Sequence, residues 1–126
     1  MVEQSLGGLD YAIVKLEGTP GATYGYAHIS GNEVELGHLL TIIQHPSGNP
    51  KKVDVGHRSG SREADYMTYN DLDTEPGSSG SGVLDQNGQL VGVHTNGGCT
   101  ATAGDNAAVL MTKIVAASPT IRSLMQ

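Results

Sequence analysis

The chain has 126 residues, which suits one compact domain with a hydrophobic core. Its formal net charge is -6, and its 7 lysines and arginines are scattered apart from the pair Lys51 and Lys52. This excludes nucleic acid as an expected partner, because binding to it needs a basic patch. No apolar run approaches membrane-spanning length, so no membrane partner is expected, and the first residues lack the pattern of a signal peptide.

Short apolar runs separated by glycine-rich turns predict strands rather than long helices. Asn87-Gly88 is a hairpin signal, because both residues tolerate positive φ. Ser118 and Pro119 predict a short terminal helix with a buried face made by Ile121, Leu124 and Met125. The single cysteine, Cys99, is expected to be a buried free thiol. The strands are expected at residues 9–16, 24–30, 39–44, 52–57, 64–69, 80–84, 89–94 and 106–111.

Six to eight strands and one terminal helix predict an all-β fold, a small antiparallel Greek-key barrel. The chain has no Phe and no Trp, so the barrel core must be aliphatic. No internal repeat or linker divides the chain.

The segment from Asp73 to Gly82 reads DTEPGSSGSG. A nucleophilic serine needs an exposed hydroxyl and amides that are free to bind an oxyanion. Gly77, Ser79 and their small neighbours meet that need. Composition alone also permits an ordinary glycine- and serine-rich loop.

This segment, with the hairpin and the strand Leu-Val-Gly-Val-His that follow it, resembles the nucleophile region of bacterial trypsin-like serine endopeptidases. The most similar sets are the glutamyl (V8-like) and the lysyl endopeptidases. The resemblance implies that Ser79 is the nucleophile, and that the amides of Gly77 and Ser79 form the oxyanion hole. The run LDYAIVKL, residues 9–16, resembles the strand of the catalytic aspartate, which implies that Asp10 orients the catalytic histidine.

In this family the histidine precedes the aspartate, but only nine residues precede Asp10 and none is a histidine. The resemblance therefore implies the C-terminal, nucleophile-bearing half of a chymotrypsin-like fold. Residues 1–17 would be the last strand of a missing N-terminal barrel, and residues 18–126 the C-terminal barrel with its helix. An N-terminal protease half would supply the histidine, so the chain alone should be inactive. Four histidines are expected to be structural: His28, His38, His45 and His57.

Thr74 lies five residues before Ser79, and His94 lies fifteen after it. In glutamyl endopeptidases a hydroxyl residue and a histidine at these offsets line the primary specificity (S1) pocket, which implies a peptide or protein substrate cleaved after Glu. A hydroxyl and an imidazole can both donate to a carboxylate. No cofactor is expected. No metal site is expected either, because the acidic residues around Asp73 lack the spacing of a calcium loop.

The sequence is also consistent with two other interpretations. A non-catalytic pseudoprotease or protein-interaction β-domain would account for the absent histidine. A serine–histidine pair within this chain, Ser79 with His57 or His94, would make the chain active by itself.

Overall fold

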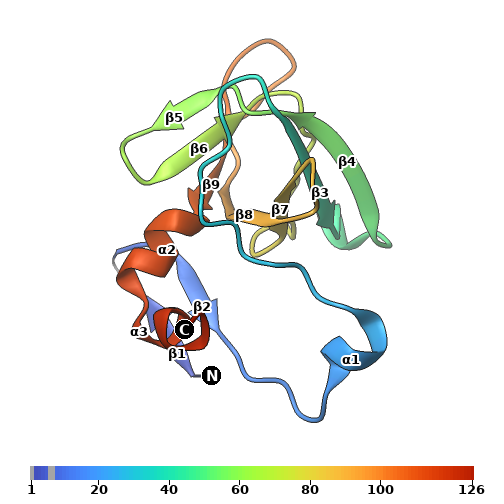
Figure 1. Cartoon of the computed structure of the whole chain (residues 1–126). Helices are drawn as coiled ribbons and strands as arrows, with labels where there is room; N and C mark the ends of the chain where they lie inside the picture. Colours follow the sequence, from blue (N-terminus) through green and yellow to red (C-terminus); the bar gives the residue numbers. More distant parts are fainter. Residues whose placement is uncertain (1, 6–7) are drawn as a thin grey trace.

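The computed structural model describes residues 2–5 and 8–126; Met1, Leu6 and Gly7, which fall within the predicted segment 1–17, lie outside the described residues. The described chain forms a two-stranded ribbon, β1–β2, and a larger sheet in the order β4-β3-β7-β8-β9-β6-β5 (Figure 1). The strands are β1 Glu3–Ser5, β2 Tyr11–Ile13, β3 Leu39–Gln44, β4 Lys52–His57, β5 Gly60–Arg62, β6 Tyr66–Tyr69, β7 Gly82–Asp85, β8 Leu90–Asn96 and β9 Asn106–Leu110. The helices are α1 Pro20–Tyr24, α2 Met111–Ala117 and α3 Pro119–Leu124, with a 3-10 turn at Pro46–Gly48.

The larger sheet curls into a barrel, and its two end strands follow each other along the chain (Figure 1). Between β4 and β5, the amide of Arg58 donates to the carbonyl of His38 (3.0 Å), next to β3. The amide of Ser59 donates to the carbonyl of Thr68 on β6 (2.8 Å). One bent segment thus joins both ends of the sheet, and the predicted all-β antiparallel barrel is confirmed.

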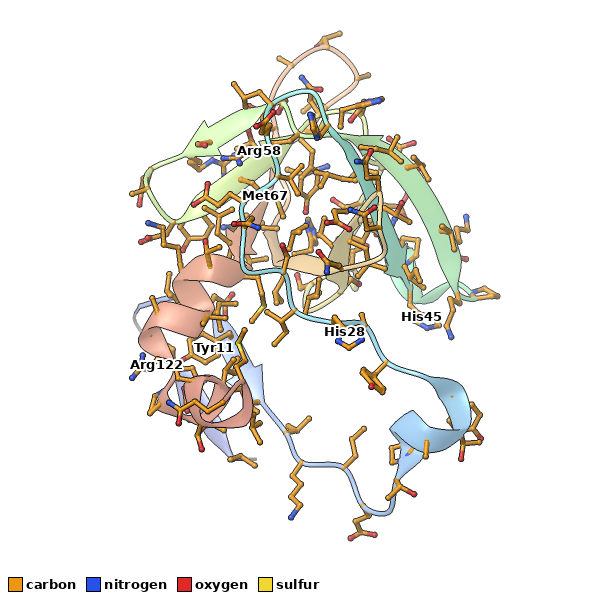
Figure 2. The ribbon with its side chains drawn as sticks, viewed as in Figure 1. Tyr11, His28, His45, Arg58, Met67 and Arg122 are labelled. Carbon is orange, nitrogen blue, oxygen red and sulfur yellow. The ribbon has the colours of Figure 1, made fainter. Side chains whose placement is uncertain are left out.

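The barrel interior is mainly aliphatic, as the composition predicted, but it also holds the buried ring of Tyr69. On β3, Leu40 and Ile42 are fully buried, whereas Leu39 and Ile43 on the opposite face are partly exposed. This alternation is what a half-buried strand requires. Met67 on β6 projects into the same interior (Figure 2). Each fully buried side chain of this size contributes about 1.5–3 kcal/mol.

The C-terminal helices hold the N-terminal ribbon against the barrel. The hydroxyl of Ser118 accepts the amide of Ile121 (3.1 Å), which confirms the predicted start of α3. Glu3 on β1 accepts the amide of Thr120 (3.3 Å) and the hydroxyl of Tyr11 (2.6 Å). Figure 2 shows Tyr11 beside these helices. The hydrogen bonds from Thr120 and Tyr11 lower the pKa of Glu3 to about 2.

Several local predictions were wrong. Residues 24–30 form no continuous strand: α1 ends at Tyr24, and a single bridge joins Ile29 to Leu90. The helix α2, which the sequence did not predict, turns the chain before α3. As a result, the buried face of α3 is made by Ile121, while Leu124 and Met125 are exposed.

Two further details differ from prediction. Cys99 is only partly buried, and its thiol contacts the carbonyl of Asn70 at 3.4 Å. Strand β2 covers only the middle of the predicted residues 9–16, and Val14 and Leu16 beyond it are exposed.

Candidate active site

The loop between β6 and β7 turns tightly around a buried serine and leaves the next one exposed. The amide of Ser78 donates to the carbonyl of Glu75 (2.9 Å), and its hydroxyl accepts the amide of Glu75 (3.2 Å). The amide of Ser81 donates to the carbonyl of Ser78 (3.1 Å). Because Ser78 is fully buried within these bonds, Ser79 lies at the surface of the turn.

Gly77 is required by the way this loop packs on its neighbour. Its φ is +100°, and a Cβ added there would lie 2.9 Å from the carbonyl oxygen of His45. The amide of Ser47 donates to the carbonyl of Pro76 (2.8 Å), which fixes the approach of the two segments. The 3-10 turn that follows β3 therefore supports the backbone just before Ser79.

Within residues 77–81 of this loop, two amides have no hydrogen-bond partner among the described residues, those of Gly77 and Ser79. The amides of Ser78, Gly80 and Ser81 between and beyond them are all bonded within the protein. Free amides beside an exposed hydroxyl are what an oxyanion site needs.

Strand β8 anchors the other side of the loop. The amide of Gly80 donates to the carbonyl of His94 (2.8 Å), and the amide of His94 donates to the carbonyl of Ser81 (2.9 Å). The hydroxyl of Ser79 points to the carbonyl of Thr95 at 3.4 Å, a long contact that leaves the hydroxyl oxygen available.

Ser79 and Asp10 line one cleft, of about 450 Å³, between the barrel and the N-terminal ribbon. Asp10 is exposed, and its carboxylate accepts no hydrogen bond from any residue that the structure describes. The cleft is lined by Gln4, Ser5, Asp10, Tyr11 and Ala12 from the ribbon, and by Ser79, Gly80, Val93, His94 and Thr95 from the barrel.

His94 is the one histidine in the described chain that lines this cleft. Its side chain is buried, and its Nδ1 lies 2.5 Å from the hydroxyl of Tyr69. Burial lowers the pKa of His94. The imidazole is therefore held within the barrel wall by Tyr69 rather than aimed at Ser79 by a carboxylate.

The other four histidines lie away from the Ser79 cleft and contact local partners; Figure 2 labels two of them, His28 and His45. His57 makes the strongest of these pairs, with Nδ1 at 2.8 Å from a carboxylate oxygen of Asp71. Burial by itself raises the pKa of the Asp71 carboxyl. The hydrogen bonds from His57 outweigh this effect, so the pKa of Asp71 is lowered. The remaining contacts are His28 with the ring of Tyr26, His38 with Glu35, and His45 with the carbonyl of Asn49.

Thr74 lines a second cavity, of about 490 Å³, which His94 does not line. The two residues predicted to share the S1 pocket thus face different cavities. The hydroxyl of Thr74 is buried and has no hydrogen-bond partner among the residues that the structure describes. Asp73 and Glu75 line the same cavity and make it acidic.

Asn106 joins the two walls of this second cavity. Its Nδ2 donates to the carbonyl of Leu72 (2.9 Å), and its Oδ1 accepts the amides of Gly98 (3.1 Å) and Cys99 (3.2 Å). Asn106 is buried; its bond to Leu72 is buried, and its bonds to Gly98 and Cys99 are partly buried. Asn106 therefore links Leu72 to the segment Gly98-Cys99 at this cavity.

Sequence reasoning missed Tyr69, Thr95 and Asn106. The hydroxyl of Thr95 is buried without a partner in the described part of the chain, and Thr95 lines the cleft with Ser79. Asn106 carried one signal, a polar residue at the start of an apolar strand. Tyr69 carried none, because its partner His94 is distant in sequence.

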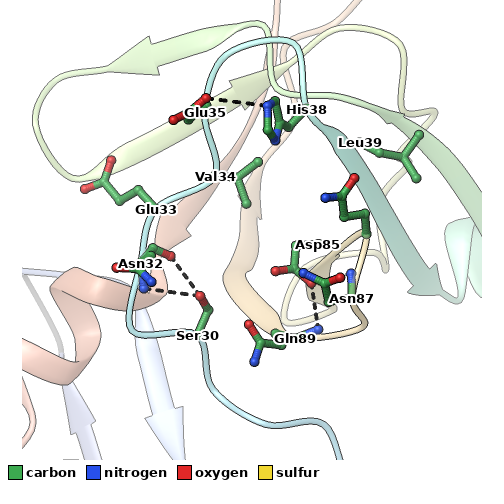
Figure 3. Close-up of a pocket in the computed structure, with 11 residues that line it drawn as sticks. Ser30, Asn32, Glu33, Val34, Glu35, His38, Leu39, Asp85, Asn87 and Gln89 are labelled. Carbon is green, nitrogen blue, oxygen red and sulfur yellow. Dashed lines mark hydrogen bonds and ion pairs between the residues drawn. The ribbon is translucent and has the colours of Figure 1, made fainter.

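A third cavity, of about 270 Å³, is lined by residues of 30–39 and 85–89 (Figure 3), and Ser79 does not line it. Its polar groups bond to one another: Glu35 pairs with His38 (3.5 Å), and Asp85 accepts the amides of Asn87 (2.8 Å) and Gln89 (2.9 Å). None of the predicted site residues lines it.

Within residues 2–5 and 8–126, no group of three or more His, Cys, Asp or Glu side chains is arranged to bind a metal ion. In the same ranges, every helix is too short or too polar to cross a membrane.

A family model described as trypsin-like peptidase domain matches residues 2–93. Among curated proteins, the secreted RxLR effector protein 73 of Plasmopara viticola is 32% identical over 105 residues, 75% of this chain. An uncharacterized protein of Sinorhizobium fredii, y4fB, is 29% identical over 104 residues, 71% of this chain. These matches cover 26% and 16% of the two relatives, so the chain spans about a quarter of their length or less.

Three solved structures are similar to this barrel. An HtrA-type protease with a decapeptide has a TM-score of 0.65 and 19% identity, over 79% of this chain and 33% of that one. A serine endoprotease from Yersinia pestis has a TM-score of 0.63 and 19% identity, over 76% and 35%. A Glu endopeptidase in complex with MPD has a TM-score of 0.61 and 26% identity, over 83% and 47%. At 19% identity, the first two likenesses show the fold alone.

Proposed function

Because this chain belongs to the trypsin-like peptidase family and has its chymotrypsin-like barrel, we propose that it carries the nucleophile of a serine endopeptidase, Ser79. The observation that carries the proposal is the exposed hydroxyl of Ser79 in a turn where two amides, those of Gly77 and Ser79 itself, have no partner among the described residues. The family suggests a hydrolase that acts on peptide substrates.

In the proposed reaction, Ser79 Oγ attacks the carbonyl carbon of the scissile peptide bond, and a histidine takes the hydroxyl proton. The amides of Gly77 and Ser79 donate to the oxyanion that forms on the carbonyl oxygen. The histidine then gives its proton to the leaving amine, and an acyl-enzyme remains. A water molecule then attacks the acyl-enzyme carbonyl in the same way, with the histidine as base. This step releases the carboxylic acid product and restores the serine hydroxyl.

Asp10 is proposed to orient that histidine. Its carboxylate lines the cleft of Ser79 and is not engaged elsewhere in the described chain, so it is available to accept an imidazole N–H. In this proposal residues 1–17, which contain the strands β1 and β2, belong to the end of an N-terminal barrel, and residues 18–126 belong to the C-terminal barrel.

The proton acceptor is proposed to come from an N-terminal protease half, so this chain alone is inactive. A general base must reach the serine hydroxyl directly or through one water. His94 is the one histidine of the described chain at the cleft, and Tyr69 already occupies its Nδ1. The chain also spans less than half of each similar structure described above.

A preference for Glu at the cleaved position is the finer part of the proposal. The unpaired hydroxyl of Thr74 and the imidazole of His94 support it, as does the 26% identity to a Glu endopeptidase. Asp73 and Glu75 oppose it, because their carboxylates repel an acidic side chain. Cleavage rates of peptides that differ only in Glu, Gln or Lys at that position test this preference, since the acidic cavity by itself favours Lys.

A non-catalytic interaction domain is the second candidate. It is favoured by one specific observation, the absence of a free histidine from the Ser79 cleft in the described chain. In that case the cleft would bind a peptide segment without cleaving it.

Labelling by a fluorophosphonate probe, together with peptide cleavage, separates the two candidates. The chain alone should show background labelling, and the chain combined with an N-terminal trypsin-like half should be labelled and should cleave peptides. Ser79→Ala should abolish both signals, and Ser81→Ala, in the same loop, should keep them. Efficient cleavage by the chain alone would refute the supplied histidine. Inactivity of the combined protein would favour the interaction domain.

A further inference from the structure

Tyr69 and His94 meet inside the barrel, across the strand that separates them. Tyr69 is on β6 and His94 is on β8, and β9 lies between these strands. In the register of β9, Tyr69 is opposite Asn106 and His94 is opposite Ala108. Because Ala108 has a small side chain on the same face, the two longer side chains reach each other over it.

The direction of the hydrogen bond follows from the buried position of the Tyr69 hydroxyl, which has one acceptor within reach among the described residues. Burial raises the pKa of Tyr69 far above neutrality, so the phenol keeps its proton. Burial lowers the pKa of His94, so the imidazole is uncharged at neutral pH. The Tyr69 hydroxyl contacts no other acceptor among the described residues. Tyr69 is thus the donor, and Nδ1 of His94 is the acceptor.

We propose that Tyr69 is a positioning residue for His94: its hydroxyl, 2.5 Å from Nδ1, places the ring proton on Nε2. His94 then offers one uncharged N–H donor at the cleft that Ser79 and Asp10 line. This inference rests on the proposed function in one respect, since it assumes that His94 contacts substrate there.

The ligand class follows from this tautomer. An uncharged N–H suits an oxygen acceptor on a substrate side chain, either a carboxylate or an amide carbonyl. It selects against side chains that carry only donors, such as Lys. His94 therefore distinguishes oxygen-bearing side chains from basic ones without carrying a charge itself.

The test is the tautomer of His94, measured by nitrogen-15 NMR on the full, unaltered chain. In the unaltered protein, Nε2 should carry the proton and Nδ1 should not. Tyr69→Phe keeps the ring and removes only the hydroxyl, so the two tautomers should become mixed. Tyr66→Phe, on the same strand but outside the His94 contact, should leave the tautomer unchanged. A proton on Nδ1 in the unaltered protein would overturn the proposal, and this measurement needs no variant.

A second measurement uses the chain combined with an N-terminal half. There, Tyr69→Phe should raise KM for substrates with Glu or Gln at the cleaved position by about three- to tenfold, the effect of one misdirected hydrogen bond, with kcat little changed. An unchanged KM would refute the positioning role. Failure of the proposed protease function would instead show as an inactive combined protein that still has the expected tautomer, so the two failures are distinguishable.

Discussion

Gly77 and Gly80 form a matched pair for testing how the Ser79 loop is built. Both have positive φ, +100° for Gly77 and +85° for Gly80, and they flank the same exposed serine. They differ in their surroundings. A Cβ added at Gly80 meets nothing within 4 Å, whereas one added at Gly77 lies 2.9 Å from the carbonyl oxygen of His45. Replacing each by Ala therefore separates backbone strain from the packing of the loop.

The magnitudes follow from these two terms. An alanine with positive φ costs about 1–2 kcal/mol, offset by about 0.4–1 kcal/mol because alanine restricts the unfolded chain. Gly80→Ala should therefore lower the free energy of unfolding by about 1 kcal/mol. Gly77→Ala adds a contact with backbone that cannot rotate away, and relieving such overpacking costs about 1–3 kcal/mol. The loss for Gly77→Ala should then be about 2–4 kcal/mol.

Urea unfolding of the two variants and the unaltered chain measures this difference. The slope of the free energy against urea should stay constant, and the midpoint should fall further for Gly77→Ala than for Gly80→Ala. Equal losses for the two variants would refute the argument, because the contact with His45 would then have no energetic consequence. The experiment needs no catalytic activity.

Three further predictions concern stability. Asn106→Ala leaves the carbonyl of Leu72 and two amides of the opposite wall unpaired, so the free energy of unfolding should fall by about 2–4 kcal/mol and residues 97–105 should become sensitive to protease. Glu3 has a pKa of about 2 in the folded chain, against an ordinary value of 4.5. Its contribution to the free energy of unfolding is therefore present above pH 4.5 and is lost as the pH falls toward 2. Thermal unfolding of Glu3→Gln should show a weaker loss of stability over that pH range. Burial lowers the pKa of His94, so the unfolded chain takes up this proton first and stability falls as the pH drops below 6.5. His94→Gln should reduce the dependence of the free energy of unfolding on pH, measured by urea titration. An unchanged dependence would contradict the burial of a neutral imidazole.

The strands were predictable where their signal is local. A short apolar run predicted β3, and an alternation of polar and apolar residues predicted β4, with the bounds that the structure has, 39–44 and 52–57. The Asn87-Gly88 pair predicted the turn between β7 and β8. The exposed position of Ser79 was predictable too, because small residues and glycines define that loop.

What the sequence could not predict depends on contacts between distant residues. The pairing of Tyr69 with His94 follows from the strand order, which places β9 between them, and no local pattern encodes that order. The separation of Thr74 and His94 into two cavities likewise depends on how the loops pack. Local propensity was overridden at residues 24–30, where the chain follows the surface with Tyr24 and Tyr26 exposed and joins the sheet only through the bridge of Ile29 to Leu90.

The closure of the barrel has a consequence for self-association. The segment that contains β4 and β5 forms main-chain hydrogen bonds at both ends of the larger sheet. The barrel therefore exposes few unpaired main-chain groups to which a foreign strand could bind. The ribbon β1–β2 is different: within the described residues, each of its strands pairs only with the other. Recruitment of a foreign strand would therefore begin at the ribbon, immediately beside the carboxylate of Asp10.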